Sequence, residues 1–340
     1  MTRFLRKVPL DSGKPTAMPC DATLLLLDKH HVEALLSKDA VLAAVQESFE
    51  LHSDRLGRVF PVVREALPTG GVFGIKSGDV PSQGLLGFKA AGFWPANRAV
   101  GGEPHQATVV LIDPGTGRPT CIIDGNAITT ARTGAAGALG LRLLARPDTA
   151  SACVFGTGVQ ARVQLDFALD TLPGITQVRY VTRDGRRDPA FEAVFAGRCA
   201  ISLAADSNAA VASSHLIITA TPGREVLFDV SAVQPGTHLN CVGADTRGKR
   251  ELPDGLLARA RIVVDDLAQA RQIGECQWLP EAACIELGDL LCGKAALQRE
   301  PADITVFDMT GLALQDLTVA RQLQRAALAT GQGTRLPWAW

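Results

Sequence analysis

Val154-Phe155-Gly156-Thr157-Gly158-Val159-Gln160-Ala161 places the pattern G-x-G-x-x-A between a strand-like apolar run and a helix-like run. In such a turn, Gly156 allows a tight bend and Gly158 lets a pyrophosphate approach the backbone. Ala161 allows close packing of helix on strand, and the helix that begins with Val159 and Gln160 offers N–H groups and a positive dipole end to phosphates. The stretch therefore predicts a dinucleotide-binding turn at Gly156, Gly158, Val159, Gln160 and Ala161.

Short apolar strands alternate with helices on both sides of this turn in sequence. The predicted strands are 152–155, 177–181, 199–203, 216–220, 237–242 and 261–264. The predicted helices are 160–172, 189–196 and 205–213. Because strands that alternate with helices form parallel sheets covered on both faces, this region predicts a Rossmann-type, doubly wound α/β sheet.

The residues before this region have a different pattern. β-prone pieces between 58 and 123 are separated by glycine- and proline-rich turns, which predicts an antiparallel sheet or barrel. Helical spacing at 31–52 and 127–144 accompanies them, and a last helix at 312–330 is expected to pack back on this unit. The predicted organisation is a flexible leader at 1–22, a mixed α+β domain built from 23–130 with 312–340, and a Rossmann domain at 131–311.

The composition narrows the class of protein. Apolar residues make up 46% and charged residues 20% of the 340 residues, which permits a substantial core. Thirty-four basic against 35 acidic residues leave a net charge of -1, with no basic excess for nucleic acid, and no apolar run is long enough to span a membrane. Eight cysteines without CxxC spacing fit free thiols in a reducing compartment, so we expect a cytoplasmic location.

The residues after strand 177–181 bear on the choice of cofactor. Thr182 and Arg183 come first at the tip where a ribose is expected, and Asp184 follows them. Arg or Thr would accept a 2′-phosphate, whereas an acidic residue would accept hydrogen bonds from free ribose hydroxyls. The order favours NADPH, and Asp184 keeps NADH open.

Four basic residues lie near the β-prone pieces of the first unit: Arg64, Lys76, Lys89 and Arg132. Most have apolar or glycine neighbours, where a charge needs a partner. Cations that converge on one cleft would bind a small carboxylate, with Arg using its bidentate fork. We therefore predict that these four residues bind substrate.

Asp245 follows a predicted strand of the parallel sheet, in the run Val242-Gly243-Ala244-Asp245. The carboxyl ends of such strands face the cofactor crevice, so Gly243 and Asp245 are expected beside the cofactor and Asp245 is a candidate proton carrier. His105 fits a structural role better than a catalytic one. The spacing of His, Asp and Glu predicts no metal site.

Taken together, the motifs resemble the ornithine cyclodeaminase/mu-crystallin family, in order from about residue 23 to 330. The matching stretches are 87–89 (GFK), 104–109 (PHQATV), 124–126 (DGN), 128–133 (ITTART), 156–161 (GTGVQA), 242–245 (VGAD), 285–289 (IELGD), 305–308 (TVFD) and 311–316 (GLALQD).

The resemblance implies a homodimer whose split first domain binds substrate and forms the dimer interface, while the Rossmann domain holds NAD(P). It implies that Arg64, Lys89 and Arg132 take the substrate carboxylate, with Lys89 also near the reacting nitrogen. Asp245 would act as general acid/base. Gln160 and Ala161 would lie on the pyrophosphate, with Arg132 and Thr133 beside the cofactor.

The resemblance implies hydride chemistry at the α-carbon of an amino or imino acid. Lys76 near the position where cyclodeaminases carry a Glu favours an anionic second group on the substrate, such as that of iminosuccinate. The expected activity is an NAD(P)H-dependent reductase of small 2-imino acids, reversible as an amino-acid dehydrogenase. The alternatives are an ornithine- or lysine-type cyclodeaminase with recycled NAD, and a mu-crystallin-like NADPH-dependent binding protein, against which the presence of Asp245 argues.

Overall fold

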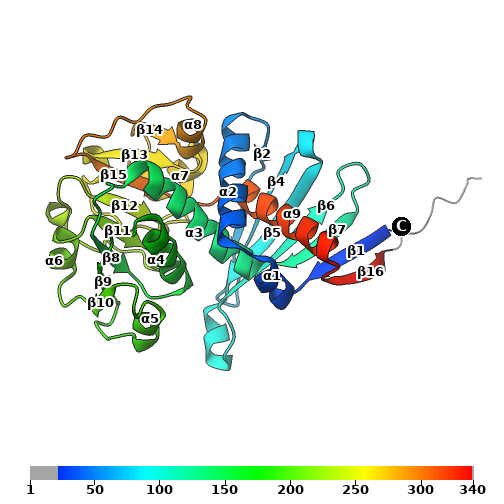
Figure 1. The fold of residues 1–340 in the computed structure, drawn as a ribbon, viewed down its shortest axis with the longest axis horizontal. Coiled ribbons are helices and arrows are strands. Elements are labelled where there is room, and N and C mark those ends of the chain that lie inside the picture. Colours follow the sequence, from blue (N-terminus) through cyan, green and yellow to red (C-terminus); the bar gives the residue numbers. More distant parts are fainter. Residues whose placement is uncertain (1–21, 339–340) are drawn as a thin grey trace, which may run out of the picture.

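Two eight-stranded sheets lie on either side of one long helix, α3 (Gly125–Leu144), in the computed structural model of the protein (Figure 1). The structure describes residues 22–338. The leader predicted at 1–22 lies outside these residues, apart from Ala22, which begins β1. The predicted boundary between residues 130 and 131 falls inside α3, so this helix belongs to both halves of the molecule.

The parallel sheet contains the dinucleotide motif and confirms the predicted α/β class. Its strands pair in the order β10-β9-β8-β11-β12-β15-β13-β14, and all of these pairs are parallel. The strand order reverses between β8 and β11, which is where such sheets bind ligands. The strands are β8 (Ser151–Phe155), β9 (Gln177–Val181), β10 (Ala200–Leu203), β11 (Leu216–Thr219), β12 (His238–Cys241), β13 (Ala260–Val264), β14 (Cys284–Glu286) and β15 (Ile304–Asp308).

The central strands of this sheet are buried on both faces, as their continuous apolar sequences require. Helices α4 (Val159–Thr171) and α5 (Pro189–Val194) cover one face, and α6 (Ser207–Ala212) and α7 (Leu267–Ile273) cover the other. The sequence analysis predicted neither β14 nor β15. The first has only three residues, and the second is a short apolar run with no helix directly before it.

The other sheet is mixed rather than purely antiparallel, because β1 runs parallel to β7. The strands pair in the order β16-β1-β7-β6-β5-β4-β2, with β3 also on β4, so the piece predicted at 58–65 forms two strands. The C-terminal strand β16 was not predicted. The strands are β1 (Ala22–Leu27), β2 (Arg58–Val59), β3 (Val63–Ala66), β4 (Val72–Val80), β5 (Leu85–Phe93), β6 (His105–Ile112), β7 (Pro119–Asp124) and β16 (Thr334–Trp338).

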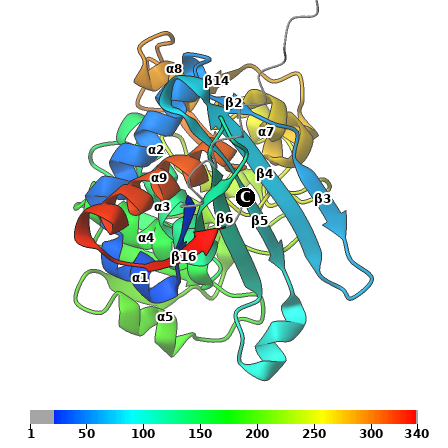
Figure 2. The ribbon, with the colours of Figure 1, turned by 90° about the vertical axis from the view of Figure 1, so that its right-hand side faces the viewer.

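Among residues 22–338, helices cover only one face of this mixed sheet. Figure 2 shows α2 (Lys38–Ser53) and α9 (Ala313–Thr330) together on one side of its strands. The covered face carries a row of directly opposed residues, Lys76, Lys89, Val109 and Ile123, so two lysines stand opposite each other under the helices. The remaining helices are α1 (Lys29–Leu35) and α8 (Leu287–Leu291); short 3₁₀ turns lie at Pro81–Gln83, Pro95–Val100, Val230–Ala232, Leu257–Arg259 and Glu275–Trp278.

A stripe of glycines lets α3 lie close to the parallel sheet. A Cβ at Gly134 would lie 2.5 Å from Phe167, one at Gly137 would lie 2.1 Å from the Gln164 amide, and one at Gly140 would lie 2.4 Å from Phe307. Side chains at these positions would push α4 and β15 away. The glycines therefore fix the distance between α3 and the dinucleotide-binding half.

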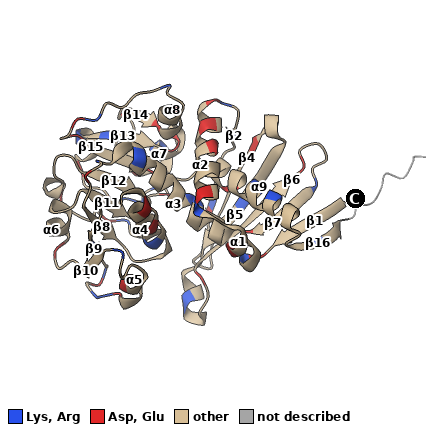
Figure 3. Ribbon diagram, viewed as in Figure 1, with Lys and Arg blue, Asp and Glu red and all other residues tan. Residues whose placement is uncertain are grey.

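The surface charge is mixed in both halves, as Figure 3 shows. Acidic and basic residues are spread over both halves of the described chain, in line with the net charge of -1. Within residues 22–338, no helix has the length and apolarity that crossing a membrane requires.

A buried ion triad joins α2 to the parallel-sheet half. His52 Nε2, at the end of α2, lies 3.1 Å from Asp266 Oδ2 and 3.8 Å from Glu286 Oε1. Burial alone lowers the pKa of His52, but the two carboxylates outweigh it and raise the pKa to about 9. The three ligand-type atoms lie within 4.8 Å of one another, although His52 is 214 residues from Asp266 and Asp266 is 20 residues from Glu286, so no local spacing pattern could have signalled the cluster.

We predict that this triad makes the stability of the protein depend on pH. A pKa raised from 6.5 to about 9 adds stability that is complete below pH 6.5 and is lost as pH rises through about 9. The His52→Gln variant should therefore be less stable than the wild type at pH 6, by up to about 3 kcal/mol, and the difference should shrink toward pH 10. Urea denaturation across this range measures it.

The matched control is His30→Gln, because His30 is exposed. It should leave the curve of unfolding free energy against pH unchanged. A constant difference between wild type and His52→Gln at all pH values would show that the imidazole contributes only packing.

Candidate active site

The glycine turn after β8 has the geometry that the motif predicts. Gly156 adopts φ +95°, and a Cβ there would lie 2.9 Å from the Ala220 carbonyl oxygen, so glycine is required. Gly158 begins α4 as its N-cap, and a Cβ there would meet nothing within 4 Å. The backbone beside Gly158 is therefore open to an approaching ligand, as a bound pyrophosphate would need.

A second observation at the same turn fits a dinucleotide. The side-chain oxygen of Gln160, in the first turn of α4, is buried without a hydrogen-bond partner. Burying such an oxygen without a hydrogen-bond donor costs free energy, unless a ligand or a water molecule donates to it. Gln160 lines a cavity of about 150 Å³ at the carboxyl ends of the parallel strands. The other lining residues are His105, Thr129, Arg132, Thr133, Ala136, Val242, Asp245, Asp265, Met309, Thr310 and Gln315.

The predicted ribose-binding residues form a turn after β9. The Thr182 hydroxyl donates to the Arg186 carbonyl at 2.9 Å, and Asp184 Oδ1 accepts from the Arg186 backbone N–H at 3.2 Å. Arg183 is exposed on the same turn. The turn thus uses part of the hydrogen-bonding capacity of Thr182 and Asp184 and leaves the Arg183 side chain toward solvent.

Two of the predicted cations share one buried carboxylate, Asp316 on α9. Lys89 Nζ donates to Asp316 Oδ1 at 2.8 Å and to the Thr129 hydroxyl at 3.2 Å, and Arg132 Nε lies 3.4 Å from the same carboxylate. Arg132 also donates to the Gln315 amide oxygen at 3.1 Å. Asp316 is fully buried. It holds Arg132, which lines the cavity, and Lys89, which lies behind Thr129 of the cavity wall.

Burial decides the protonation of Lys89. It lowers the pKa, as do Arg132 and Lys76, while Asp316 raises it, and the outcome is a pKa of about 7. The Asp316 carboxyl has the opposite balance: burial raises its pKa, but Lys89 and Arg132 outweigh burial and lower it. At neutral pH, Lys89 is therefore close to the point at which it gains or loses a proton.

Lys76, the opposed lysine on β4, is held by backbone. Its ammonium donates to the carbonyl oxygens of Thr310 and Gly311, each at 2.7 Å. Burial lowers its pKa to about 8. Of the described residues, the cavity wall includes Arg132 and Asp245 but neither Lys76 nor Lys89, which lie one contact behind it through Thr310 and Thr129.

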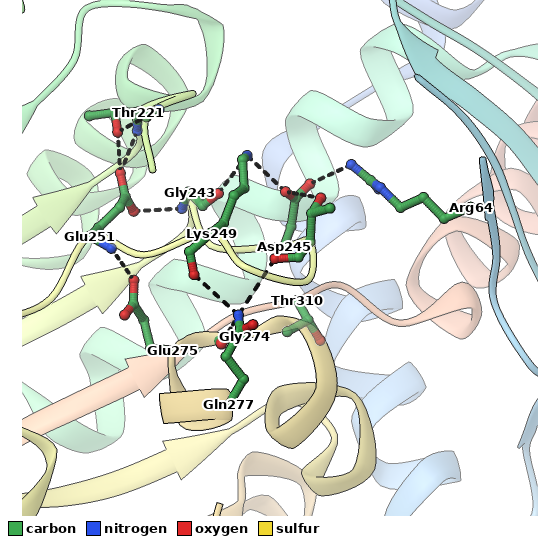
Figure 4. Close-up of polar contacts among 12 residues, drawn as sticks. Arg64, Thr221, Gly243, Asp245, Lys249, Glu251, Gly274, Glu275, Gln277 and Thr310 are labelled. Atoms are coloured by element: carbon green, nitrogen blue, oxygen red, sulfur yellow. Dashed lines mark hydrogen bonds and ion pairs between the residues drawn. The ribbon is translucent and has the colours of Figure 1, made fainter. Parts of the chain in front are cut away.

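Asp245 lies in the loop after β12 and meets cations from both halves of the molecule (Figure 4). Lys249 Nζ lies 2.9 Å from Asp245 Oδ1, and Arg64 Nη2, on β3 of the mixed sheet, lies 3.7 Å from Oδ2. Burial raises the pKa of Asp245, but Lys249, Arg64 and Lys76 outweigh burial and lower it to about 2. Asp245 is therefore a carboxylate at neutral pH.

Further carboxylates fix the loops around this site. Glu251 accepts from the Gly243 N–H at 3.0 Å and from the Thr221 N–H and hydroxyl at 2.8 and 2.6 Å, which joins the loops after β11 and β12 (Figure 4). Asp265, after β13, accepts from the Thr310 hydroxyl at 2.8 Å and from the Gly311 N–H.

The sequence analysis did not predict site roles for Asp316, Asp265, Lys249 or Glu251. Asp316 and Glu251 follow Gln315 and Arg250 in runs that carry no pattern for a buried carboxylate. Two signals were available: Asp316 ends the family-matching stretch 311–316, and Asp265 lies at the end of an apolar strand, where polar residues face the crevice. Of the residues it did predict, the structure gathers Arg64, Arg132, Thr133, Gln160 and Asp245 around one cavity, with Lys76 and Lys89 behind it.

The chain is similar over nearly its whole length to proteins of known activity. The iminosuccinate reductase of Paracoccus denitrificans is 32% identical over 326 residues, which cover 91% of this chain and 98% of that protein. The alanine dehydrogenase of Archaeoglobus fulgidus is 31% identical over 322 residues, covering 92% and 98%.

Solved structures agree in fold. The crystal structure of the Paracoccus denitrificans iminosuccinate reductase in complex with NAD+ superposes with a TM-score of 0.85 at 31% identity, covering 92% of this chain and 99% of that one. The Thermococcus litoralis Delta(1)-pyrroline-2-carboxylate reductase, in complex with NADH and L-proline, gives 0.85 at 26% identity, covering 91% and 99%. The model of the ornithine cyclodeaminase/mu-crystallin family matches residues 23–331, which confirms the resemblance seen in the motifs: the chain belongs to this family.

Proposed function

We propose that the protein is an NAD(P)H-dependent reductase of small 2-imino acids, which runs in reverse as an amino-acid dehydrogenase. The observation that carries the proposal is the cavity in which Arg132 and Asp245 meet Gln160 of the dinucleotide turn. Arg132 supplies a cation that can bind a carboxylate, and Asp245 supplies an anion that can bind a positively charged nitrogen. Gln160 belongs to the turn expected to bind the cofactor. The relatives named above act on iminosuccinate, alanine and pyrroline-2-carboxylate. Each of these compounds has a carboxylate and a nitrogen that is positively charged or becomes so on protonation.

The turn at Gly156 and Gly158 would hold the cofactor. The buried side-chain oxygen of Gln160 would accept a hydrogen bond from it. When bound, the nicotinamide supplies or accepts the hydride. Arg183, exposed beside the ribose position, favours NADPH, while the family relatives solved with NAD+ and NADH support use of NADH as well. We propose that both are accepted and NADPH is preferred.

The substrate carboxylate would bind the guanidinium of Arg132, which Asp316 and Gln315 hold in a fixed orientation. A planar guanidinium held in this way can bind a carboxylate with two parallel hydrogen bonds. Arg64 reaches the same space from β3 and can bind the carboxylate when it leaves Asp245. Fixing one end of the imino acid restricts the position of its α-carbon and so lowers the entropic part of the barrier.

The two candidate proton carriers differ in pKa, and the difference suggests separate roles. Lys89, with a pKa of about 7, donates to the Thr129 hydroxyl, and Thr129 lines the cavity, so a proton can pass from Lys89 through that hydroxyl. Asp245, with a pKa of about 2, stays ionised and would stabilise the positive charge of the iminium nitrogen. We therefore assign proton exchange to Lys89 and charge stabilisation to Asp245, in place of the acid/base role expected for Asp245.

A homodimer is part of the proposal. Leu26, Phe88, Val110 and Ile122 form a row on the face of the mixed sheet that α2 and α9 leave open, and all four are half-buried. An apolar sheet face of this kind fits a second copy of the chain. A solved relative with a TM-score of 0.85 is an archaeal alanine dehydrogenase dimer with bound NAD.

The activity itself is tested with a panel of imines and both cofactors. The panel contains 2-oxoacids with ammonia or methylamine, pyrroline-2-carboxylate, piperideine-2-carboxylate and iminosuccinate. We expect net loss of NAD(P)H absorbance with at least one imine. Release of ammonia from ornithine or lysine without net change in cofactor would identify a cyclodeaminase, and tight NADPH binding without turnover of any compound would identify a binding protein.

The roles of Lys89 and Asp245 are separated by pH profiles. Reduction needs a protonated Lys89, so kcat for reduction should fall as pH rises through about 7, and kcat for the reverse oxidation should rise over the same range. Lys89→Met should lower kcat and remove this dependence. Asp245→Asn should lower kcat by about 10²–10³-fold and keep the dependence, because it removes only a charge at the nitrogen.

If Asp245→Asn abolishes the dependence near pH 7 and Lys89→Met preserves it, the two roles are reversed. Native NADH affinity in both variants, measured by quenching of protein fluorescence, serves as the control for an intact cofactor turn.

Arg183→Ala tests the cofactor preference. Loss of a charge-assisted contact to a 2′-phosphate should weaken NADPH binding by about tenfold or more and leave NADH binding little changed. The matched control is Arg187→Ala, because Arg187 is already paired with Glu192 and should affect both cofactors equally. Equal losses of NADPH and NADH in Arg183→Ala would mean that this arginine does not contact the 2′-phosphate.

A further inference from the structure

Lys249 holds the loop that carries Asp245 through its side chain. Its ammonium donates to the Gly243 carbonyl oxygen at 2.8 Å and to Asp245 Oδ1 at 2.9 Å (Figure 4). The side chain of Lys249 therefore links a later part of the loop after β12 to Gly243 and Asp245 near the start of that loop. The side chain is largely buried, with 18% of its surface exposed, so water does not screen these contacts strongly.

The backbone of Lys249 is anchored independently of its side chain. Its carbonyl oxygen accepts from Gln277 Nε2 at 3.1 Å and from the Trp278 indole N–H at 3.0 Å. Gln277 also accepts from the Gly248 N–H at 2.7 Å. Because the 3₁₀ turn Glu275–Trp278 fixes the main chain, the position of the ammonium is set before any substrate arrives.

Among the described residues, two cationic side chains lie within 4 Å of Asp245. They differ in the part of the chain they come from, in distance and in exposure. Lys249 comes from the same loop, is closer and makes a hydrogen bond. Arg64 comes from the opposite sheet, lies 3.7 Å away and is one-third exposed. A substrate carboxylate that binds Arg64 must compete with Asp245 for it. If Arg64 were the only close partner of Asp245, that competition would weaken substrate binding.

We propose that Lys249 is a positioning residue that keeps Asp245 in place as an ion-paired carboxylate, and so frees Arg64 to bind the carboxylate of the imino acid. The proposal rests on the proposed function, since it needs an anionic substrate in this cavity. Figure 4 shows Lys249 on the side of Asp245 away from Arg64, and Lys249 does not line the cavity.

The test compares Lys249→Met, Lys249→Arg and the control Lys29→Met on the imine that the wild type reduces best. Lys249→Met should raise KM by about tenfold or more, because Asp245 then retains Arg64. Lys249→Arg keeps the charge and should restore most of the affinity. Lys29 is exposed and paired with Glu103, so Lys29→Met should leave KM and kcat unchanged. NADH affinity should be native in all three.

A double-mutant cycle separates this role from a general loosening of the loop. With Asp245→Asn as the background there is no anion to hold, so Lys249→Met should change KM by less than about twofold. An equal rise in KM in both backgrounds would overturn the proposal, as would a native KM in Lys249→Met or a failure of Lys249→Arg to restore affinity. A wild type that reduces none of the imines would remove the proposed function, and the role of Lys249 with it.

Discussion

The packing of α3 between the two sheets is the constraint on which the rest of the structure depends. Its glycine stripe lies against Phe167, Gln164 and Phe307 of the parallel-sheet half, where no larger residue would fit. The same helix carries Thr129, Arg132 and Thr133 at the cavity. Because one rigid helix belongs to both halves, the distance between the substrate cations and the dinucleotide turn is set by packing and not by a flexible linker.

The cationic side chains of Lys89, Arg132, Arg64 and Lys249 at this junction lie beside carboxylates. Lys89 and Arg132 share Asp316, and Arg64 and Lys249 share Asp245. An isolated buried charge would be unstable; these four cations are balanced by carboxylates, whereas Lys76 donates to the carbonyl oxygens of Thr310 and Gly311. The same balance sets the protonation states: burial brings the pKa of Lys89 to about 7, while the surrounding cations bring that of Asp245 to about 2.

The site also depends on contacts that hold its loops. Glu251 joins the loops after β11 and β12, and Asp265 fixes the turn at Thr310. The His52 triad joins the end of α2 to Asp266, which follows β13, and to Glu286, the last residue of β14. Asp265 and Thr310 line the cavity, whereas Glu251 and the His52 triad lie outside its wall. They explain how catalytic side chains on irregular segments can keep a defined geometry, since loops alone are more mobile than the strands that precede them.

The sequence alone determined the parallel α/β sheet, the dinucleotide turn and four of the twelve residues that line the cavity, Arg132, Thr133, Gln160 and Asp245. These features depend on local patterns: apolar runs that alternate with helices, a glycine pair in which Gly156 adopts a positive φ and Gly158 leaves the backbone open, and polar residues at strand ends. The partners of those residues were decided only by the tertiary structure. Lys89 and Asp316 are 227 residues apart, and Lys76 and Thr310 are 234 apart, so no spacing rule connects them. Protonation was likewise undetermined, because a pKa depends on burial and on neighbouring charges that only the packed chain brings together.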